Sequence, residues 1–459
     1  MRTLRLAPLL LRGRVRAGHG LIDLMSVAAF TLSGWLLLVV TAGVNAFWNR
    51  QLVPPAAFLA LFGDHGADNA SQLVLWTILA ACAGVLLIVP LLTLGAAAAR
   101  MGALGRDRRL ACLRLLGATG AQVVALSVIE TMLAALVGAV VGTIGYLVTL
   151  PAWQAVTFQA TPLSATEMLL PLWGIGGVVA VLVLLAGVSS MGGLARLRIS
   201  PLGVARRQPR RALKLWRFVA LPAAVVAWVL TVPLLHLGRE LALGAAIIAV
   251  ALALFMGVIN LVGPWLLQLL GLVLTRFGRP SVLLAGRRLL ADPKAAWRSV
   301  SGLAFVGFTG GALVTLPDFA ATDPDPLVRI LSDDLRTGIY LTLAIAFLVA
   351  AASTLLNQAS AVLDRRAELR QLANVGVPVD LHARTRLVEV VAPAALSALG
   401  SGGLAVFFFG LLPKVGAQQL GAVPFALALL AGLGLVWVAG EACRPLVRSA
   451  VVATGPRID

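Results

Sequence analysis

Long apolar runs with almost no charged residues constrain this chain more than any other feature. Ten such runs, each of roughly 20 residues or more, lie at about 25–47, 73–99, 119–150, 168–194, 218–235, 241–275, 299–317, 338–363, 387–412 and 424–443. Lipid offers no water to backbone polar groups, so runs of this kind cross membranes as helices. The chain is 60% hydrophobic and only 12% charged, more apolar surface than a water-soluble domain could bury. The sequence therefore predicts an all-α polytopic membrane protein with about ten transmembrane helices.

The basic residues predict how the chain is oriented. With a cytoplasmic N-terminus, five of the 37 Lys and Arg residues face outward and the other 32 face the cytoplasm; the five are Arg50, Arg239, Arg329, Arg336 and Lys414. Several acids, including Asp333 and Asp334, fall in the outward segments. This is the positive-inside pattern, and it predicts cytoplasmic N- and C-termini with an even number of spans. The net charge of +18 is thus expected to meet anionic lipid, with no role in binding nucleic acid.

The first apolar run has two interpretations. It ends in Val44-Asn45-Ala46, which loosely fits a signal-peptide cleavage site, but about 24 residues precede the run and it exceeds a usual signal core. An uncleaved first span is favoured, and the segment before Met25 is expected to be an interfacial amphipathic helix.

Catalytic patterns are missing from the sequence. The three cysteines and four histidines show no disulfide or metal-ligand spacing. No phosphate-binding loop and no nucleophile–base constellation in a plausible context occurs. We therefore expect no catalytic residues, no cofactor and no metal in this chain, and we do not expect it to be an enzyme.

Two segments repeat 259 residues apart. "RDRRLACLRLLGATGAQVVALSVIE" begins at Arg106 and "RRAELRQLANVGVPVDLHARTRLVE" begins at Arg365, so that Gly117 aligns with Gly376. Six predicted spans separate the copies, and because six is even both copies enter the membrane in the same direction, as in a parallel repeat. The sequence predicts a four-span module at 1–195 and a second at 281–459. Residues 196–280 would join them through a basic linker and a two-helix hairpin.

Each copy begins with a basic stretch that ends at a glycine. We call residues 106–117 the first elbow and residues 365–376 the second elbow. In the first, Leu110, Leu113 and Leu116 form an apolar stripe at helical spacing, and Gly117 permits a sharp turn into the next span. In the second, Gly376-Val377-Pro378 is the predicted turn. The arginines could simply mark the inner membrane boundary, but their recurrence favours docking of a soluble partner.

Each elbow is followed by an acid within a predicted span. Glu130 and Glu389 both lie 13 residues after their glycines, about 20 Å of helical rise. Intramembrane acids are costly and suggest a function such as a proton relay. The sequence favours the alternative, a polar pin between helices, because a relay would present several acids on facing helices. Gly138 and Gly142, four residues apart, predict a close helix contact.

The first elbow resembles the signature of the FtsX-like permease family of ABC transporters. Leu110, Leu113, Arg114, Leu116, Gly117, Ala118 and Glu130 match that signature. Arg109 stands where the family has a glutamate, which the second copy supplies as Glu368. The second copy departs at Asn374-Val375-Gly376-Val377, where the family has a leucine-glycine-alanine turn. The chain also lacks the large extracellular domain common among ten-span members.

The resemblance implies a permease subunit driven by a separate ABC ATPase, with two ATPase copies per permease chain and with ATP and Mg²⁺ bound by the ATPase. The elbows would be coupling helices that carry ATPase motion across a bacterial plasma membrane, for export or for mechanotransmission. Candidate substrates are an antimicrobial peptide, an antibiotic or a lipid. The implied docking residues are Arg106, Arg108, Arg109, Leu110, Leu113, Arg114 and Gly117 in the first elbow, and Arg365, Arg366, Glu368, Leu369, Leu372 and Gly376 in the second.

Two other functions fit the sequence. A secondary transporter driven by an ion gradient would want paired acids at a midplane cavity and helices broken at corresponding places in the two halves. Pro90 and Pro264 could break helices, but their positions do not correspond. A membrane sensor or scaffold that transports nothing is the third possibility.

Overall fold

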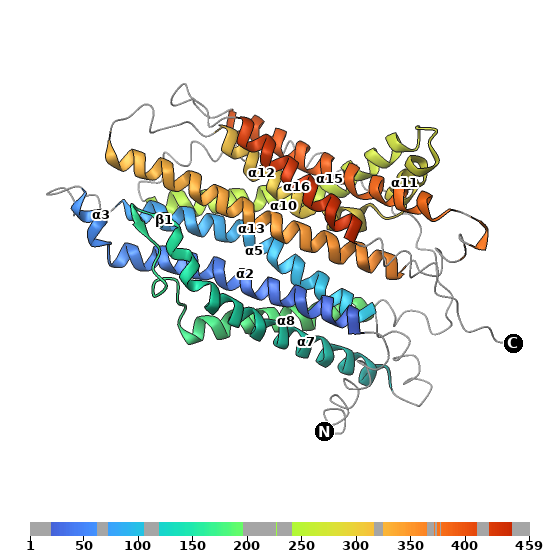
Figure 1. Ribbon diagram of the computed structural model, residues 1–459, viewed down its shortest axis with the longest axis horizontal. Helices are drawn as coiled ribbons and strands as arrows, with labels where there is room; N and C mark the ends of the chain where they lie inside the picture. The colour runs from blue at the N-terminus through green and yellow to red at the C-terminus, as the bar shows by residue number, and fades with distance from the viewer. Residues whose placement is uncertain are drawn as a thin grey trace.

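Long helices account for almost all of the structure (Figure 1). A computed structural model describes residues 20–61, 72–104, 119–195, 226, 241–315, 325–364, 371, 374–376, 378–410 and 422–442. The helices of the first half are α2 (Gly20–Leu52), α3 (Ala56–Ala60), α5 (Leu73–Leu104), α7 (Gly120–Thr149) and α8 (Leu172–Ala195). Those that follow are α10 (Leu241–Leu274), α11 (Pro280–Ala291), α12 (Pro293–Thr315), α13 (Pro326–Asp364), α15 (Val379–Gly410) and α16 (Ala422–Ala442).

Nine of the ten predicted spans coincide with one of these helices, and of the predicted span 218–235 only Val226 is described. Within the described residues, seven helices are long and apolar enough to cross a membrane: α2, α5, α7, α8, α10, α13 and α15. The all-helical membrane class is therefore supported, and the total of ten spans stays a prediction. The proposed interfacial helix before Met25 lies almost entirely outside the described residues, which begin at Gly20.

Two of the segments between predicted spans contain regular structure. Residues 318–337 lie between the predicted spans 299–317 and 338–363, yet α13 already begins at Pro326. Asp325 explains this start, because its carboxylate accepts a hydrogen bond from the backbone N–H of Leu327 at 2.9 Å and so satisfies a donor of the first turn. Between α7 and α8 the chain forms a 3₁₀ helix, η2 (Leu150–Ala155), and a two-stranded antiparallel hairpin of β1 (Thr157–Phe158) and β2 (Thr161–Pro162).

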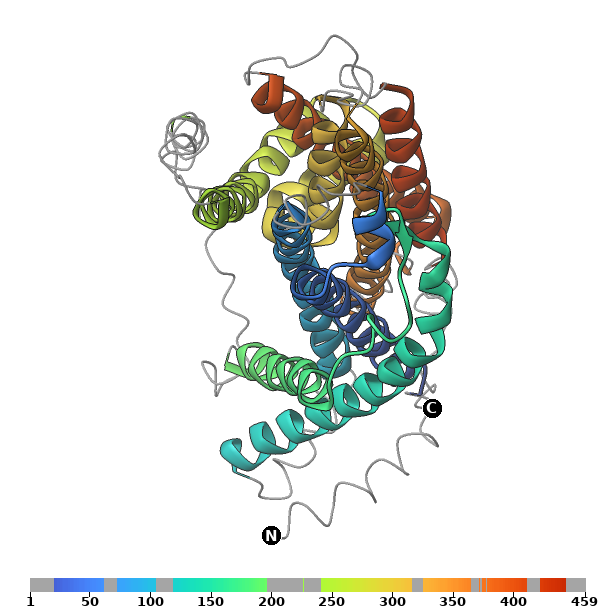
Figure 2. The same ribbon diagram turned by 90° about the vertical axis from the view of Figure 1, so that its left-hand side faces the viewer.

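The two halves pair their helices in the same order. In the first half α2 packs against α5 and α7, and α8 packs against α5 and α7. In the second half α12 packs against α13 and α15, and α16 packs against α13 and α15. Viewed along the long axis, the first half (blue to green) and the second half (yellow to red) occupy different sides of the molecule (Figure 2). α5 contacts α13 between them, and α10 contacts both α5 and the second half.

Glycines allow backbone contact between α2 and α7 in the first half and between α12 and α15 in the second. A Cβ added at Gly142 of α7 would lie 2.7 Å from the carbonyl oxygen of Thr31 in α2, which confirms the close approach predicted there. In the second half α12 takes the place of α2 and α15 that of α7, and here the glycine is on α12. A Cβ added at Gly311 of α12 would lie 2.3 Å from the carbonyl oxygen of Gly402 in α15. Such contacts are how helices associate in lipid, where no hydrophobic force drives them together.

Replacement of Gly311 by alanine tests this packing. We expect Gly311→Ala to lower the free energy of unfolding by about 1–3 kcal/mol, because the new methyl group would force α12 and α15 apart. Gly403→Ala, on α15, is the matched control, since a Cβ there would meet no heavy atom within 4 Å. Thermal unfolding in detergent measures both variants, and equal midpoints for the two would contradict the contact.

Candidate functional site

α5 and α13 lie side by side and run in the same direction. Near their C-terminal ends, the Ser360 hydroxyl donates a hydrogen bond to the sulfur of Met101 at 3.1 Å. Near their N-terminal ends, the indole N–H of Trp76 donates to Oδ2 of Asp334 at 2.7 Å. The partners are separated by 259 and 258 residues along the chain. Residues one repeat apart therefore touch at one end, and residues one position short of a repeat touch at the other, as expected when two elements are related by a twofold axis running between them.

The predicted docking residues lie almost entirely outside the described part of the chain. This applies to Arg106, Arg108, Arg109, Leu110, Leu113, Arg114 and Gly117, and to Arg365, Arg366, Glu368, Leu369 and Leu372. The exception is Gly376, which is exposed and adopts the left-handed backbone (φ +90°). Glycine commonly ends a helix in this conformation, so the turn predicted at Gly376 is present. The docking role of both elbows stays a prediction.

The helix that follows the first elbow has a well-defined start. The backbone N–H of Gln122 donates to the Thr119 hydroxyl at 3.3 Å, and the backbone N–H of Thr119 donates to the Gln122 side chain at 3.0 Å. This reciprocal pair satisfies two donors that the first turn would otherwise leave open. α7 therefore begins within three residues of Gly117.

The two intramembrane acids occupy different surroundings. Glu389 of α15 forms an ion pair with Arg288 of α11 at 3.4 Å, and the side chains are 20% and 12% exposed. A bond between helices is the contact expected of a polar pin. Glu130 of α7 is buried, with 4% of its surface exposed. The roles of both acids stay predictions.

At the opposite end of the molecule from α11 (Figure 1), Arg50 fastens the hairpin to the end of α2. Its guanidinium donates to the carbonyl oxygens of Phe158 and Pro162, both at 2.8 Å. It also donates to both carboxylate oxygens of Glu167, at 3.2 and 2.8 Å. Arg50 is only 2% exposed, so its charge is held by a two-pronged carboxylate contact and by backbone acceptors.

Asp334 then joins this hairpin to the second half. Its Oδ2 atom accepts the Trp76 indole and also the backbone N–H of Gln159 at 2.8 Å. One carboxylate of α13 therefore holds α5 and the hairpin tip together. We call Trp76, Gln159 and Asp334 the outer hub.

The tip of the β1–β2 hairpin, Gln159 and Ala160, has a strained backbone. Gln159 and Ala160 have positive φ angles of 56° and 57°, a region that residues other than glycine seldom occupy. The Gln159 side chain is fully buried, and neither its amide nitrogen nor its amide oxygen has a hydrogen-bond partner. Strained backbone and unpaired buried polar groups persist only where the surrounding structure holds them, and they cluster at functional sites. The outer hub is therefore a candidate functional site in its own right.

Sequence reasoning placed Arg50 and Asp334 in outward segments but missed their contacts. The usable signal was the repeat offset: Asp334 lies 258 residues after Trp76, so a parallel α5–α13 pair would have brought them together. The Arg50 cradle had no such signal, because its acceptors are mostly backbone carbonyls. Among the described residues, no group of three or more His, Cys, Asp or Glu side chains is placed to hold a metal ion.

Removal of the Asp334 carboxylate tests the outer hub. Asp334→Ala would leave two buried N–H donors without an acceptor, and we expect it to lower the free energy of unfolding by about 1–3 kcal/mol. Asp333→Ala is the neighbouring control, since its side chain is 74% exposed and a loss below about 0.5 kcal/mol is expected there. Thermal unfolding in detergent compares the two, and a similar loss in both would exclude a special role for Asp334.

The Glu167 contact should also make stability depend on pH. Burial raises the pKa of Glu167, but hydrogen bonds from Arg50 and Ser164 and the Arg50 charge outweigh burial and hold it below its ordinary value of 4.5. A lowered carboxyl pKa stabilises the fold fully above the unfolded-state value, and this contribution disappears as the pH falls through the folded-state value. We therefore expect Glu167→Gln to melt below the wild type at neutral pH, with the gap closing as the pH drops below 4.5. A gap that stays constant across that range would contradict the assignment.

The sequence shows no match to known proteins that would assign a role to the site. No family model matches the sequence, and no curated protein matches it. The observations that bear on function are therefore the parallel α5–α13 pair, the turn at Gly376 and the outer hub.

Proposed function

We propose that this chain is the permease subunit of an ABC transporter of the FtsX-like kind. In this proposal two four-helix modules, 1–195 and 281–459, are joined by a basic linker and two further helices, which gives ten spans. The protein would lie in a bacterial plasma membrane with both termini in the cytoplasm. A separate ATPase, in two copies, would bind ATP and Mg²⁺ and dock on the two elbows.

One observation carries the proposal: residues one repeat apart touch across α5 and α13. Ser360 contacts Met101, and the two residues are 259 positions apart, which is the offset found in the sequence. The matching order of helix contacts within 20–195 and 293–442 gives further support. A parallel repeat about a twofold axis is the arrangement that two identical ATPases require, because each needs an equivalent docking point.

The positions flanking the elbows support docking at one end of the molecule. α5 ends at Leu104, three residues after Met101, and α13 ends at Asp364, four residues after Ser360. Because Met101 and Ser360 touch, the ends of α5 and α13, which the elbows follow in the sequence, lie close together. Approach of two bound ATPases would therefore push on α7 and α15 together. The outer hub lies at the other end of α5 and α13. A change in the angle between the two halves would alter its hydrogen bonds there.

The rival functions have less support. A proton-driven transporter needs acids that can gain and lose protons in a shared cavity, whereas Glu389 is bound to Arg288 in an ion pair. A sensor or scaffold moved by the same ATPase would share every contact described above. That alternative differs only in the absence of a transported substrate, and a transport measurement has to separate the two.

Charge placed on the elbows tests ATPase docking. We expect Leu113→Asp combined with Leu372→Asp to abolish co-purification with the partner ATPase, because an aspartate would disrupt the apolar face of each elbow. Membrane insertion should be unchanged, since neither residue lies in a span. Leu283→Asp is the control: Leu283 is 40% exposed on α11 and is not in an elbow. Complex formation that survives in the double variant would count against the proposal.

Substrate and direction call for reconstitution with that ATPase. Vanadate-sensitive ATP hydrolysis in liposomes, stimulated by one of a panel of antimicrobial peptides, antibiotics and lipids, would name the substrate class. Movement of that compound across the bilayer would establish transport and its direction. Stimulated hydrolysis without movement of any compound would favour the sensor.

A further inference from the structure

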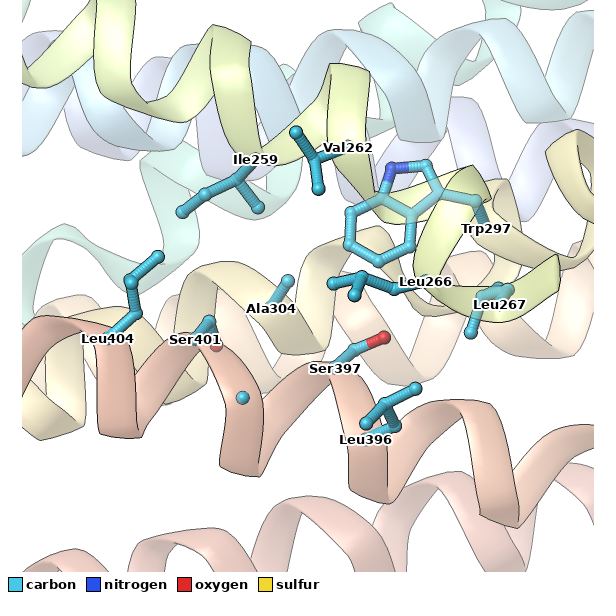
Figure 3. A pocket seen from close by; sticks show the side chains of 11 residues that line it. Ile259, Val262, Leu266, Leu267, Trp297, Ala304, Leu396, Ser397, Ser401 and Leu404 are labelled. Atoms are coloured by element: carbon cyan, nitrogen blue, oxygen red, sulfur yellow. The ribbon is translucent and has the colours of Figure 1, made fainter. Parts of the chain in front are cut away.

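A pocket opens between α10, α12 and α15 in the second half (Figure 3). Its volume is about 130 Å³, and apart from Trp297 and two serines its lining is entirely aliphatic or glycine. α10 and α15 are both among the helices able to cross a membrane, and nine of the eleven lining residues fall within those two segments, while Trp297 and Ala304 are on α12. The pocket therefore lies within the membrane-spanning part of the protein.

The pocket exists because one side chain holds α10 away from the other two helices. α12 and α15 touch through their backbones, as a Cβ added at Gly307 would lie 2.1 Å from the carbonyl oxygen of Ala398. Trp297 of α12 fills the space against α10, where a Cβ added at Gly263 would lie 2.2 Å from the indole. The indole N–H is bonded to Asn260 at 3.1 Å, so the ring is held in place. Beyond the indole, the space between α10 and α15 is left open.

One polar group in the pocket lacks a partner. The Ser401 hydroxyl donates to the carbonyl oxygen of Ala398 at 3.2 Å, and the Trp297 N–H is also satisfied. Ser397 is only 6% exposed, and its hydroxyl has no hydrogen-bond partner. Figure 3 shows this hydroxyl pointing from α15 toward Leu266 and the side of the pocket where Trp297 lies. A buried hydroxyl without a partner is unfavourable, so this donor indicates a ligand that carries an acceptor.

The mouth of the pocket decides which molecules can reach it. Gly400 is exposed and a Cβ there would meet no heavy atom within 4 Å, and Leu266 is 38% exposed. Within the described part of the chain this side of the pocket is exposed, which would let a ligand enter from lipid. Water is a poor occupant, because an ordered water needs two to four polar partners and Ser397 offers one. A bare hydrocarbon chain would leave the hydroxyl unpaired.

We propose that this pocket binds a lipid-soluble carbonyl compound whose inserted part is about the size of one six-membered ring. The carbonyl oxygen would accept the Ser397 hydroxyl, and the apolar ring would lie between Leu266, Ala304 and the Trp297 indole. The size follows from volume, since a cavity of roughly 150 Å³ holds one benzene molecule.

The site belongs to the second half only. The offset of 259 aligns Ser397 with Gly138, where a Cβ would lie 2.5 Å from the Phe30 side chain and 2.9 Å from the carbonyl oxygen of Val27. The corresponding space of the first half is therefore filled by α2. A site without a counterpart in the other half is expected to modulate the protein from the side, independently of any path shared by the two halves.

A pair of fluorinated probes tests the assignment in the full-length protein. 4′-Fluoroacetophenone carries the carbonyl, and 4-fluorocumene has nearly the same shape without it. Fluorine NMR of each probe in lipid nanodiscs, with protein-free nanodiscs as the baseline, measures binding. We expect the wild type to bind the ketone more tightly than the hydrocarbon. Ser397→Ala should weaken ketone binding by roughly three- to tenfold and leave hydrocarbon binding unchanged.

Two glycine variants locate the binding. Gly400→Leu would fill the mouth of the pocket and should abolish binding of both probes. Gly403→Leu, on the same helix and also facing open space, does not line the pocket and should leave binding at the wild-type level. Equal affinity for the two probes in the wild type, or binding that persists in Gly400→Leu, would overturn the proposal.

Discussion

The contact between α5 and α13 is the interaction on which the arrangement of the two halves depends. Lipid supplies no hydrophobic force to hold helices together, so packing and polar contacts must do so. Here the pair is joined at one end by Ser360 and Met101 and at the other by Trp76 and Asp334. Because the partners are 259 residues apart at one end and 258 at the other, the two halves meet at nearly equivalent positions. In the proposed permease this pair would be the axis about which one half moves against the other.

The outer hub joins the two halves but contains strained backbone and an unpaired buried amide. Gln159 and Ala160 adopt left-handed backbone, and the buried Gln159 amide has no partner. Arg50 offsets this cost by holding the hairpin through two carbonyl groups and Glu167, and Asp334 holds its tip. A contact that combines strong anchors with local strain is suited to having two states, because release of the tip would relieve the strain. The hub lies at the N-terminal ends of α5 and α13, away from the ends that the elbows follow in the sequence.

The two halves share an order of contacts without sharing details. In the first half the glycines that allow backbone contact are on α7, whereas in the second they are on α12. Among the described elements, α10 packs against α5 and against α11, α12 and α15. Trp297 separates α10 from α12 beside the pocket. The repeat therefore constrains which helices meet, while individual side chains decide how tightly they meet and where space remains.

The sequence by itself determined the membrane class, most span positions and the turn at Gly376, because these follow from local composition and from the backbone freedom of glycine. It also supplied the offset of 259 that the Ser360–Met101 contact reproduces. Tertiary structure alone decided the Arg50 cradle, the outer hub and the pocket at Ser397. Each of these depends on backbone carbonyls, left-handed residues or unfilled volume brought together from distant segments. Such features leave no periodicity in the chain, so they become visible only when the helices are packed.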